Sequence, residues 1–128
     1  MDRDELDKIG TQIVEACFEV HKELGPGLLE SAYVAALLTE LGFRGIGAEV
    51  KVRIPLFYKG QDTGKYYEAD LLIEEEIIIE AKAVETMIPL SQAQLLSHLR
   101  LTNKKLGYLV NFNVILMKDG IKRMRNGY

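Results

Sequence analysis

Two wholly apolar triplets stand on either side of three consecutive glutamates near the middle of the chain. Leu71–Ile73 and Ile77–Ile79 flank Glu74–Glu76. A strand that alternates polar and apolar residues has one face in water, whereas an unbroken apolar strand is covered on both faces. The pattern therefore predicts two neighbouring central strands, Tyr66–Ile73 and Ile77–Lys82, joined by the acidic turn.

The rest of the chain predicts helices and further strands around this pair. Apolar residues at helical spacing indicate a first helix, and Gly25-Pro26-Gly27 separates it from a second helix that we expect to stop at Gly42. The predicted elements are helices at about 4–24, 28–41 and 90–104, strands at 50–54, 66–73, 77–82 and 106–111, a turn at 59–64, and a hairpin of 114–117 with 121–125 around Asp119-Gly120. This order predicts an α/β fold with a central mixed β-sheet flanked by helices.

Length and composition favour one intracellular domain. The chain has 128 residues, enough for one hydrophobic core, so we expect residues 1–128 to form a single domain. Cys17 is the only cysteine, which excludes an internal disulfide and favours a reducing compartment. No stretch has the length of a membrane span or the make-up of a signal peptide, so we expect a cytoplasmic protein that does not enter a membrane.

The net charge of −3 lacks the basic excess typical of nucleic-acid-binding proteins, but the charges are unevenly distributed. The acids gather in the N-terminal helix and the acidic turn, whereas the C-terminal segment holds Lys118, Lys122, Arg123 and Arg125. The C-terminal hairpin is therefore the expected surface for a nucleic acid backbone. Lys51 and Arg53 are expected to face solvent, either as phosphate contacts or as ordinary surface charges.

The acidic turn also brings charged residues together. If the turn is centred on Glu75, residues at equal distances from it lie opposite each other, and Asp70 faces Glu80. Opposed side chains on one face of a sheet have Cβ atoms about 4.5–5.5 Å apart, and Lys82 follows Glu80 on the same face. The sequence therefore predicts a cluster of Asp70, Glu80 and Lys82 on one face. A slip of one residue in register would move Asp70 to the other face.

Two opposed carboxylates within apolar strands are unfavourable unless something neutralises them. A hard divalent cation would relieve the repulsion, and Mg²⁺ is usually held by one or two carboxylates together with water and substrate oxygens. Lys82 would then act on an attacking water or on a developing negative charge. The alternative is an ordinary ion pair of Lys82 with Asp70 or Glu80 at a strand end, without a metal.

These residues resemble the signature of a known superfamily. Asp70 followed by Glu80-Ala81-Lys82 is similar to the signature of the PD-(D/E)XK nucleases. The segment Gly27-Leu-Leu-Glu-Ser-Ala-Tyr33 is similar to the motif of the GxxExxY proteins, a small bacterial branch of that superfamily. Further matching segments lie in the same order along the chain, at 58–60, 69–72, 93–96 and 111–112, so the resemblance covers about residues 9–125.

The resemblance implies a restriction-endonuclease-like core and hydrolysis of nucleic acid phosphodiester bonds with Mg²⁺ or Mn²⁺. By position, Asp70 and Glu80 would be metal ligands, the backbone carbonyl of Ala81 a further ligand, and Lys82 the catalytic lysine. The implied partner is DNA or RNA, and so short a chain is compatible with a homodimer or a partner protein. Two other functions stay open: a catalytically inert binding module with this fold, and a hydrolase of another phosphate ester.

Glu30 matches an acidic residue that many of these nucleases carry on an early helix, which makes it a candidate catalytic and metal-binding residue. Tyr33 and Leu37 follow it at helical spacing, so we expect Glu30 on an apolar, inward-facing side of its helix. The alternative is structural, because a carboxylate in a first helical turn favours the helix dipole. Tyr33 is expected to pack in the core with a hydrogen-bonded hydroxyl.

Gln94 matches the glutamine on the helix after the E-x-K strand in exonuclease-like branches, which makes it a candidate catalytic residue. In those branches a tyrosine often follows four residues later; here His98 holds that position, on the same helix face. We expect His98 either as a hydrogen-bonded histidine of the helix face or as a phosphate contact in place of tyrosine. The alternative for Gln94 is structural, because Ser91 to Gln94 has the spacing of a capping box.

Overall fold

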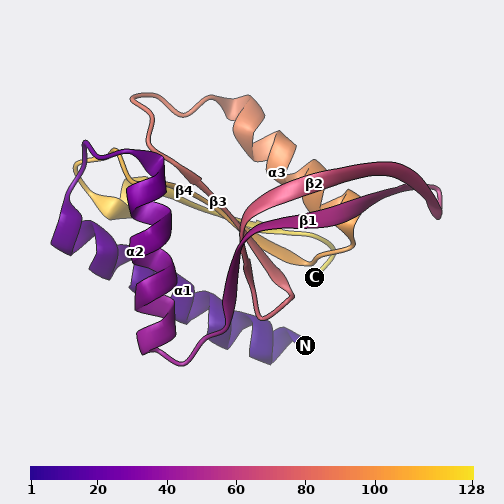
Figure 1. Cartoon of the computed structure of the whole chain (residues 1–128), viewed down its shortest axis with the longest axis horizontal. Helices are drawn as coiled ribbons and strands as arrows, with labels where there is room; N and C mark the ends of the chain where they lie inside the picture. The colour runs from indigo at the N-terminus through magenta and orange to yellow at the C-terminus, as the bar shows by residue number, and fades with distance from the viewer.

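The computed structural model describes residues 1–128 and contains one five-stranded sheet with helices on both faces (Figure 1). The strands are arranged in the order β1-β2-β3-β4-β5, with β3 and β4 parallel and all other neighbours antiparallel. In chain order the elements are α1 (Arg3–Leu24), α2 (Glu30–Phe43), β1 (Ala48–Tyr58), β2 (Gln61–Ile73), β3 (Ile77–Lys82), α3 (Pro89–Thr102), β4 (Leu106–Asn111), the short 3₁₀ helix η1 (Met117–Asp119) and β5 (Ile121–Arg125). This architecture confirms the predicted α/β fold with a mixed sheet flanked by helices.

Two apolar clusters fill the space between the sheet and its helices. On one face, Ile77 and Ile79 of β3 pack in the cluster formed with α1 and α2. On the other face, Ile78 packs with Leu95 and Leu99 of α3. All five side chains are fully buried, and each buried aliphatic side chain of this size stabilises the fold by about 1.5–3 kcal/mol. The apolar triplets are therefore central strands, as predicted.

The acidic turn has the predicted register. Leu71 pairs with Ile79 and Ile73 pairs with Ile77, so the turn is centred on Glu75. Glu74 and Glu75 both have positive φ, of 50° and 61°, as do the central residues of the tight turns that match the twist of a hairpin.

The face that each side chain of β1 and β2 occupies changes at Lys51 and Asp70. These two residues are missing from the ladder between Val50–Leu71 and Val52–Ala69, and Lys51 has a φ of 52°. On one side of this point Ala69 packs in the cluster beneath α3; on the other side Leu71 packs beneath α1 and α2. Because Asp70 opens toward α2, as Leu71 does, two consecutive residues share one face.

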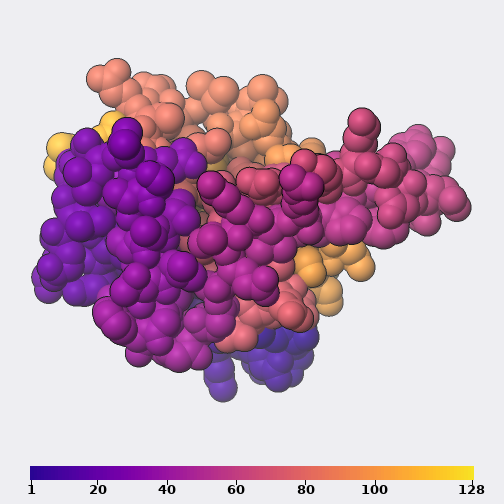
Figure 2. Space-filling view, viewed as in Figure 1, coloured from indigo at the N-terminus to yellow at the C-terminus, as the bar shows by residue number.

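The β1–β2 hairpin projects beyond the rest of the sheet as an arm (Figure 2). Only a short strand at 50–54 and a turn at 59–64 were expected, whereas β1 continues to Tyr58 and β2 begins at Gln61. Lys59 and Gly60, with φ of 49° and 79°, form the tip. The pairing shifts between Pro55 and Phe57, so the arm is irregular along its length.

Helix α2 ends later than expected. Gly42 lies within the helix, and the chain turns at Gly45, which has a φ of 71°. The N–H of Gly45 donates to the Gly42 carbonyl and that of Ile46 to the Leu41 carbonyl, both at 3.0 Å. These two bonds define a Schellman ending, in which glycine occupies the left-handed position beyond the helix cap.

The predicted C-terminal hairpin of 114–117 with 121–125 is wrong. Only 121–125 forms a strand, and β5 pairs with β4 instead. Gly120 has a φ of −100°, outside the positive range that a two-residue Asp-Gly hairpin turn needs. Its carbonyl accepts a hydrogen bond of 2.8 Å from the Asn111 N–H, which continues the β4–β5 pairing.

Candidate active site at the β2–β3 fork

Strands β2 and β3 separate after the Leu71–Ile79 pair, and the side chain of Asp70 lies in the fork between them. Its Oδ2 accepts a hydrogen bond of 2.9 Å from the backbone N–H of Ala81, so the carboxylate takes the place of a strand partner. The carbonyl of Lys82 accepts from Phe112 on the β4 side. Since successive peptide groups of a strand point to opposite sides, the Ala81 carbonyl faces the side of Asp70.

Glu80 is the buried carboxylate of the site, with only 8% of its surface exposed. Its Oε1 accepts a 2.5 Å hydrogen bond from the hydroxyl of Tyr67 and lies 3.0 Å from Nδ1 of His98 on α3. The Tyr67 and His98 rings stack, with centroids 3.9 Å apart. Two side chains from different elements therefore hold one Glu80 oxygen in place.

The other carboxylate oxygens of the fork are open. Neither Oδ1 of Asp70 nor Oε2 of Glu80 has a hydrogen-bond partner in the protein, and no fully buried side-chain oxygen lacks a partner. Both oxygens must therefore contact solvent. Each carboxylate is anchored by one oxygen and offers the other, which is an arrangement suited to binding a ligand.

Asp70 and Glu80 do not share a face as predicted. Asp70 opens into a cavity beside α2, whereas Glu80 is bound by residues on the α3 side of the sheet. The register was predicted correctly, but the irregularity at Lys51 and Asp70 turns Asp70 to the other side. The two carboxylates therefore lie on opposite faces at the fork, close enough for the charge of Glu80 to raise the pKa of Asp70.

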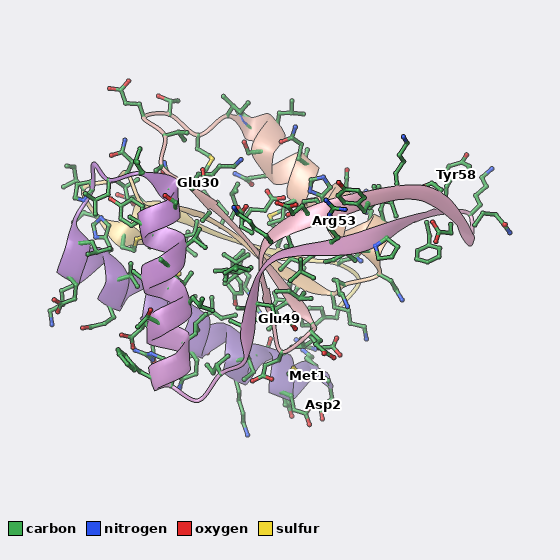
Figure 3. The ribbon with its side chains drawn as sticks, in the orientation of Figure 1. Met1, Asp2, Glu30, Glu49, Arg53 and Tyr58 are labelled. Atoms are coloured by element: carbon green, nitrogen blue, oxygen red, sulfur yellow. The ribbon has the colours of Figure 1, made fainter.

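The cavity beside α2 has a volume of about 450 Å³ and contains both Glu30 and Asp70, with Lys51 at its wall. Glu30 is the first residue of α2 (Figure 3) and lines the cavity together with Asp70, but its side chain is exposed rather than turned fully inward as expected. Partial burial raises the pKa of Glu30, the charge of Asp70 raises it further, and Lys82 opposes the rise. Glu30 therefore belongs to the same charge cluster from an outer position.

The groups around Asp70 shift its pKa in opposite directions. Burial raises the pKa of Asp70, the Ala81 N–H opposes this, and Glu80 raises it further against the opposing charge of Lys82. Lys82 forms no ion pair with either carboxylate, so the alternative of a plain strand-end ion pair is wrong. Its ammonium group is close enough to influence the site and is free to contact a ligand.

Tyr33 connects the loop before α2 to the core. Its hydroxyl donates to the Gly25 carbonyl at 2.6 Å and accepts from the Leu28 N–H at 3.1 Å, and its fully buried ring stacks on Phe112. The predicted core position with a bonded hydroxyl is confirmed. Gly27, in the same loop, has a φ of 97°, which glycine adopts without strain, and the Tyr33 hydroxyl bonds hold the loop on both sides of it.

Helix α3 begins at Pro89, with Ile88 as its cap and no capping side chain. The capping box proposed for Ser91 and Gln94 is therefore wrong, and Ser91 is instead buried within the helix. Gln94 is exposed and its side chain makes no hydrogen bond within the protein, so its catalytic role stays a prediction. His98, one turn further, is the residue of this helix face that contacts the site.

Sequence reasoning did not identify Tyr67. In a regular strand side chains alternate between the two faces. Counting back from Leu72 in this way would place Tyr66 on the face of Glu80 and Tyr67 on the opposite face. The change of faces at Asp70 reverses this assignment. Two consecutive tyrosines were a visible signal, but their sides depend on an irregularity between strands that no local pattern reveals.

The C-terminal basic residues lie away from the fork. β5 is at the opposite edge of the sheet from β1, and β4 separates it from β3. Arg123 forms an ion pair of 2.5 Å with Asp7 of α1 and also contacts the Tyr128 hydroxyl. The expected backbone-binding surface is thus partly neutralised and is not adjacent to the carboxylates.

The donor groups of the fork are carboxylate and carbonyl oxygens, the type of ligand that hard divalent cations take. No three aspartate, glutamate, histidine or cysteine side chains are grouped as metal ligands. Mg²⁺, however, is usually held by only one or two carboxylates and keeps several waters. The open oxygens of Asp70 and Glu80, with the nearby Ala81 carbonyl, meet that requirement.

Comparison with known proteins agrees with this geometry. The family model of the PD-(D/E)XK nuclease superfamily matches residues 7–124. The chain therefore belongs to the PD-(D/E)XK nuclease superfamily. No curated protein and no solved structure matches it significantly. None of its helices has the length and apolarity needed to cross a membrane.

Proposed function

We propose that this protein is a metal-dependent nuclease that hydrolyses phosphodiester bonds of DNA or RNA. The observation that carries the proposal is the fork itself, where two anchored carboxylates offer open oxygens beside an unpaired lysine. Membership of the nuclease superfamily supports the same reaction. We place the catalytic unit in the domain formed by residues 1–128.

In this proposal Asp70, Glu80 and the Ala81 carbonyl hold Mg²⁺ or Mn²⁺, with Glu30 reaching it directly or through water. A bound divalent ion would neutralise the scissile phosphate and lower the pKa of an attacking water. The Ala81 N–H holds the Asp70 carboxylate, and Tyr67 and His98 hold that of Glu80, so neither has to reorganise on binding.

Lys82 is assigned to the reacting phosphate. An ammonium group without a carboxylate partner is free to orient the attacking water or to stabilise the negative charge that develops on the phosphate oxygens. Gln94, exposed on α3 one turn before His98, is assigned to positioning the substrate or the water. Both roles require the substrate to enter along the open side of the fork.

The branch of the superfamily and the compartment are also proposals. The Tyr33 contacts give the Gly27-x-x-Glu30-x-x-Tyr33 spacing a structural purpose, which supports the GxxExxY branch. Burial raises the pKa of the lone Cys17 to about 12, so this thiol is unreactive and structural. A single buried thiol is compatible with a reducing bacterial cytoplasm.

The test is a cleavage panel of single- and double-stranded DNA and RNA, each with Mg²⁺, Mn²⁺ or EDTA. We expect cleavage that depends on the metal and that falls by at least about 100-fold in Lys82→Ala. Lys8→Ala, which removes an exposed lysine of α1, is the matched control and should cleave normally. Undiminished cleavage by Lys82→Ala would exclude the assigned mechanism.

An inert binding module is the second candidate, favoured by one observation: Glu80 already has two partners in the protein. Calorimetric titration with Mg²⁺ and Mn²⁺ separates the two candidates. No heat of binding that depends on Asp70 and Glu80 would favour the inert module. Metal binding without cleavage of any nucleic acid would favour a hydrolase of another phosphate ester.

A further inference from the structure

The projecting part of the β1–β2 arm is more positive than the chain as a whole, although the full hairpin from Ala48 to Ile73 is neutral because Glu49 and Asp70 lie at its base. Between residues 51 and 68 it carries four cations and two acids, for a net charge of +2, whereas the whole chain has −3. The cations are Lys51, Arg53, Lys59 and Lys65. Figure 3 shows Arg53 near the base of the arm and Tyr58 near its tip. A projecting cationic element on an acidic protein attracts polyanions locally.

None of these cations forms an ion pair. Two other arginines, Arg44 and Arg123, are by contrast held by carboxylates. Arg53 instead lies over the ring of Tyr66, with its guanidinium carbon 4.4 Å from the ring centre, and Lys59 lies 5.4 Å from the ring centre of Tyr58. Cations held only by aromatic rings keep their N–H donors for a phosphate.

Three aromatic side chains of the arm are exposed to solvent. Phe57, Tyr58 and Tyr66 have 46%, 61% and 51% of their surfaces exposed. Lysines on an edge strand protect it against pairing with other chains, but exposed aromatic rings have the opposite effect. Protection of the edge strand would explain the exposed lysines but not the exposed aromatic rings. Stacking of nucleic acid bases on the arm explains both the cations and the rings.

The base of the arm leads to the candidate site. Tyr66, Glu68 and Asp70 occupy alternate positions of β2, and Arg53 stacks on Tyr66 from the same side. Four residues of a strand span roughly 13 Å, about the rise of four stacked nucleotides. A strand held at Tyr66 would therefore reach Asp70 within a few nucleotides.

We propose that the β1–β2 arm binds single-stranded nucleic acid, with unpaired bases stacked on Tyr66 and Tyr58 and phosphates bound by Arg53, Lys51 and Lys59. Aromatic rings and arginine planes take unpaired bases of any sequence, whereas paired bases have no free face to offer. The proposal rests on the nuclease function above and makes a single strand, or a single-stranded end, its substrate.

The experiment measures binding of fluorescent 12-nucleotide single strands and of the matching duplex by anisotropy in EDTA, where metal-dependent cleavage does not occur. We expect Tyr66→Ala to weaken single-strand binding by about 5-fold or more, with little effect on the duplex, and Tyr66→Phe to bind like wild type. Arg53→Ala should also lower the slope of log affinity against log salt by about 0.7. Phe43→Ala and Arg3→Ala are matched controls for an exposed ring and an arginine away from the arm, and both should bind normally.

The outcomes separate this proposal from the nuclease function. Single-strand binding that depends on Tyr66, without cleavage, would support the binding role of the arm and overturn the nuclease proposal. Cleavage that depends on Lys82, with unchanged single-strand binding in Tyr66→Ala and Arg53→Ala, would overturn the binding role of the arm and support the nuclease proposal. Absence of single-strand binding by the wild type, or equal losses for single strand and duplex in Tyr66→Ala, would also overturn the stacking role.

Discussion

The hydroxyl of Tyr67 donates a 2.5 Å hydrogen bond to Oε1 of Glu80, and the stacked ring of His98 contacts the same oxygen. The first residue comes from β2 and the second from α3, so the orientation of this buried carboxylate depends on the packing of two elements on β3. Groups that orient a metal ligand typically affect metal affinity almost as strongly as the ligand itself.

Tyr67→Phe should therefore weaken Mn²⁺ binding by about 10-fold or more while leaving the fold intact. The ring still stacks on His98, but Glu80 loses its shortest hydrogen bond. Isothermal titration calorimetry with Mn²⁺ measures the change. Tyr66→Phe is the neighbouring control, because that hydroxyl has no partner in the protein, and equal affinities of the two variants would contradict the role of Tyr67.

Asp70→Asn should stabilise the metal-free protein while abolishing cleavage. Burial and the Glu80 charge raise the pKa of Asp70 in the folded state, so its ionised form opposes folding. The unfolding free energy at neutral pH should rise by up to about 1 kcal/mol, measured by urea denaturation in EDTA. A loss of stability would show that the carboxylate is held by more than the Ala81 N–H.

The raised pKa of Asp70 also predicts how the unfolding free energy changes with pH. A raised folded-state pKa means that protonation of Asp70 favours the native state. The stability that the protonated carboxyl contributes is therefore present at low pH and is lost as pH rises through the folded-state pKa. The difference in unfolding free energy between Asp70→Asn and wild type should therefore shrink as pH falls from 7 toward 4. Metal binding should weaken over the same range, because protons compete for the carboxylate. A difference independent of pH would contradict the shift.

Tyr33→Phe should lower the unfolding free energy by about 1–3 kcal/mol, because the variant leaves the Gly25 carbonyl and the Leu28 N–H without their partner. Cleavage should fall as well, since this loop positions Glu30 at the start of α2. Urea denaturation and the cleavage assay measure the two effects. Tyr58→Phe, at an exposed ring without a hydrogen bond, is the control and should keep its stability.

Lys51→Val and Lys51→Gly test the change of faces at Asp70. Both remove the same charge, but only glycine adopts a φ of 52° without strain, and a β-branched residue there costs about 1–3 kcal/mol. The valine variant should be less stable than the glycine variant and should lose more metal affinity, because a regular ladder would move Asp70. Calorimetry and denaturation measure both, and equal behaviour would show that the backbone at Lys51 does not set the site.

The central hairpin was predictable because its signals are local. Apolar triplets demand burial on both faces, and a short acidic turn between them leaves one favourable register. The C-terminal hairpin was not predictable in the same way. Asp119-Gly120 carries a hairpin signal, but β4 pairs with β5 directly, because its backbone groups find partners there.

For the candidate site, too, one part was predictable from the sequence and another part was not. The register that places Asp70 and Glu80 at the same level of the β2–β3 hairpin follows from a turn centred on Glu75, and the sequence alone determines it. Which face Asp70 occupies, and that Tyr67 and His98 hold Glu80, only the tertiary structure decided. The physical reason is that register follows from short-range burial and turn chemistry, whereas the irregularity at Lys51 exists only when β1, β2 and the two helical layers pack together.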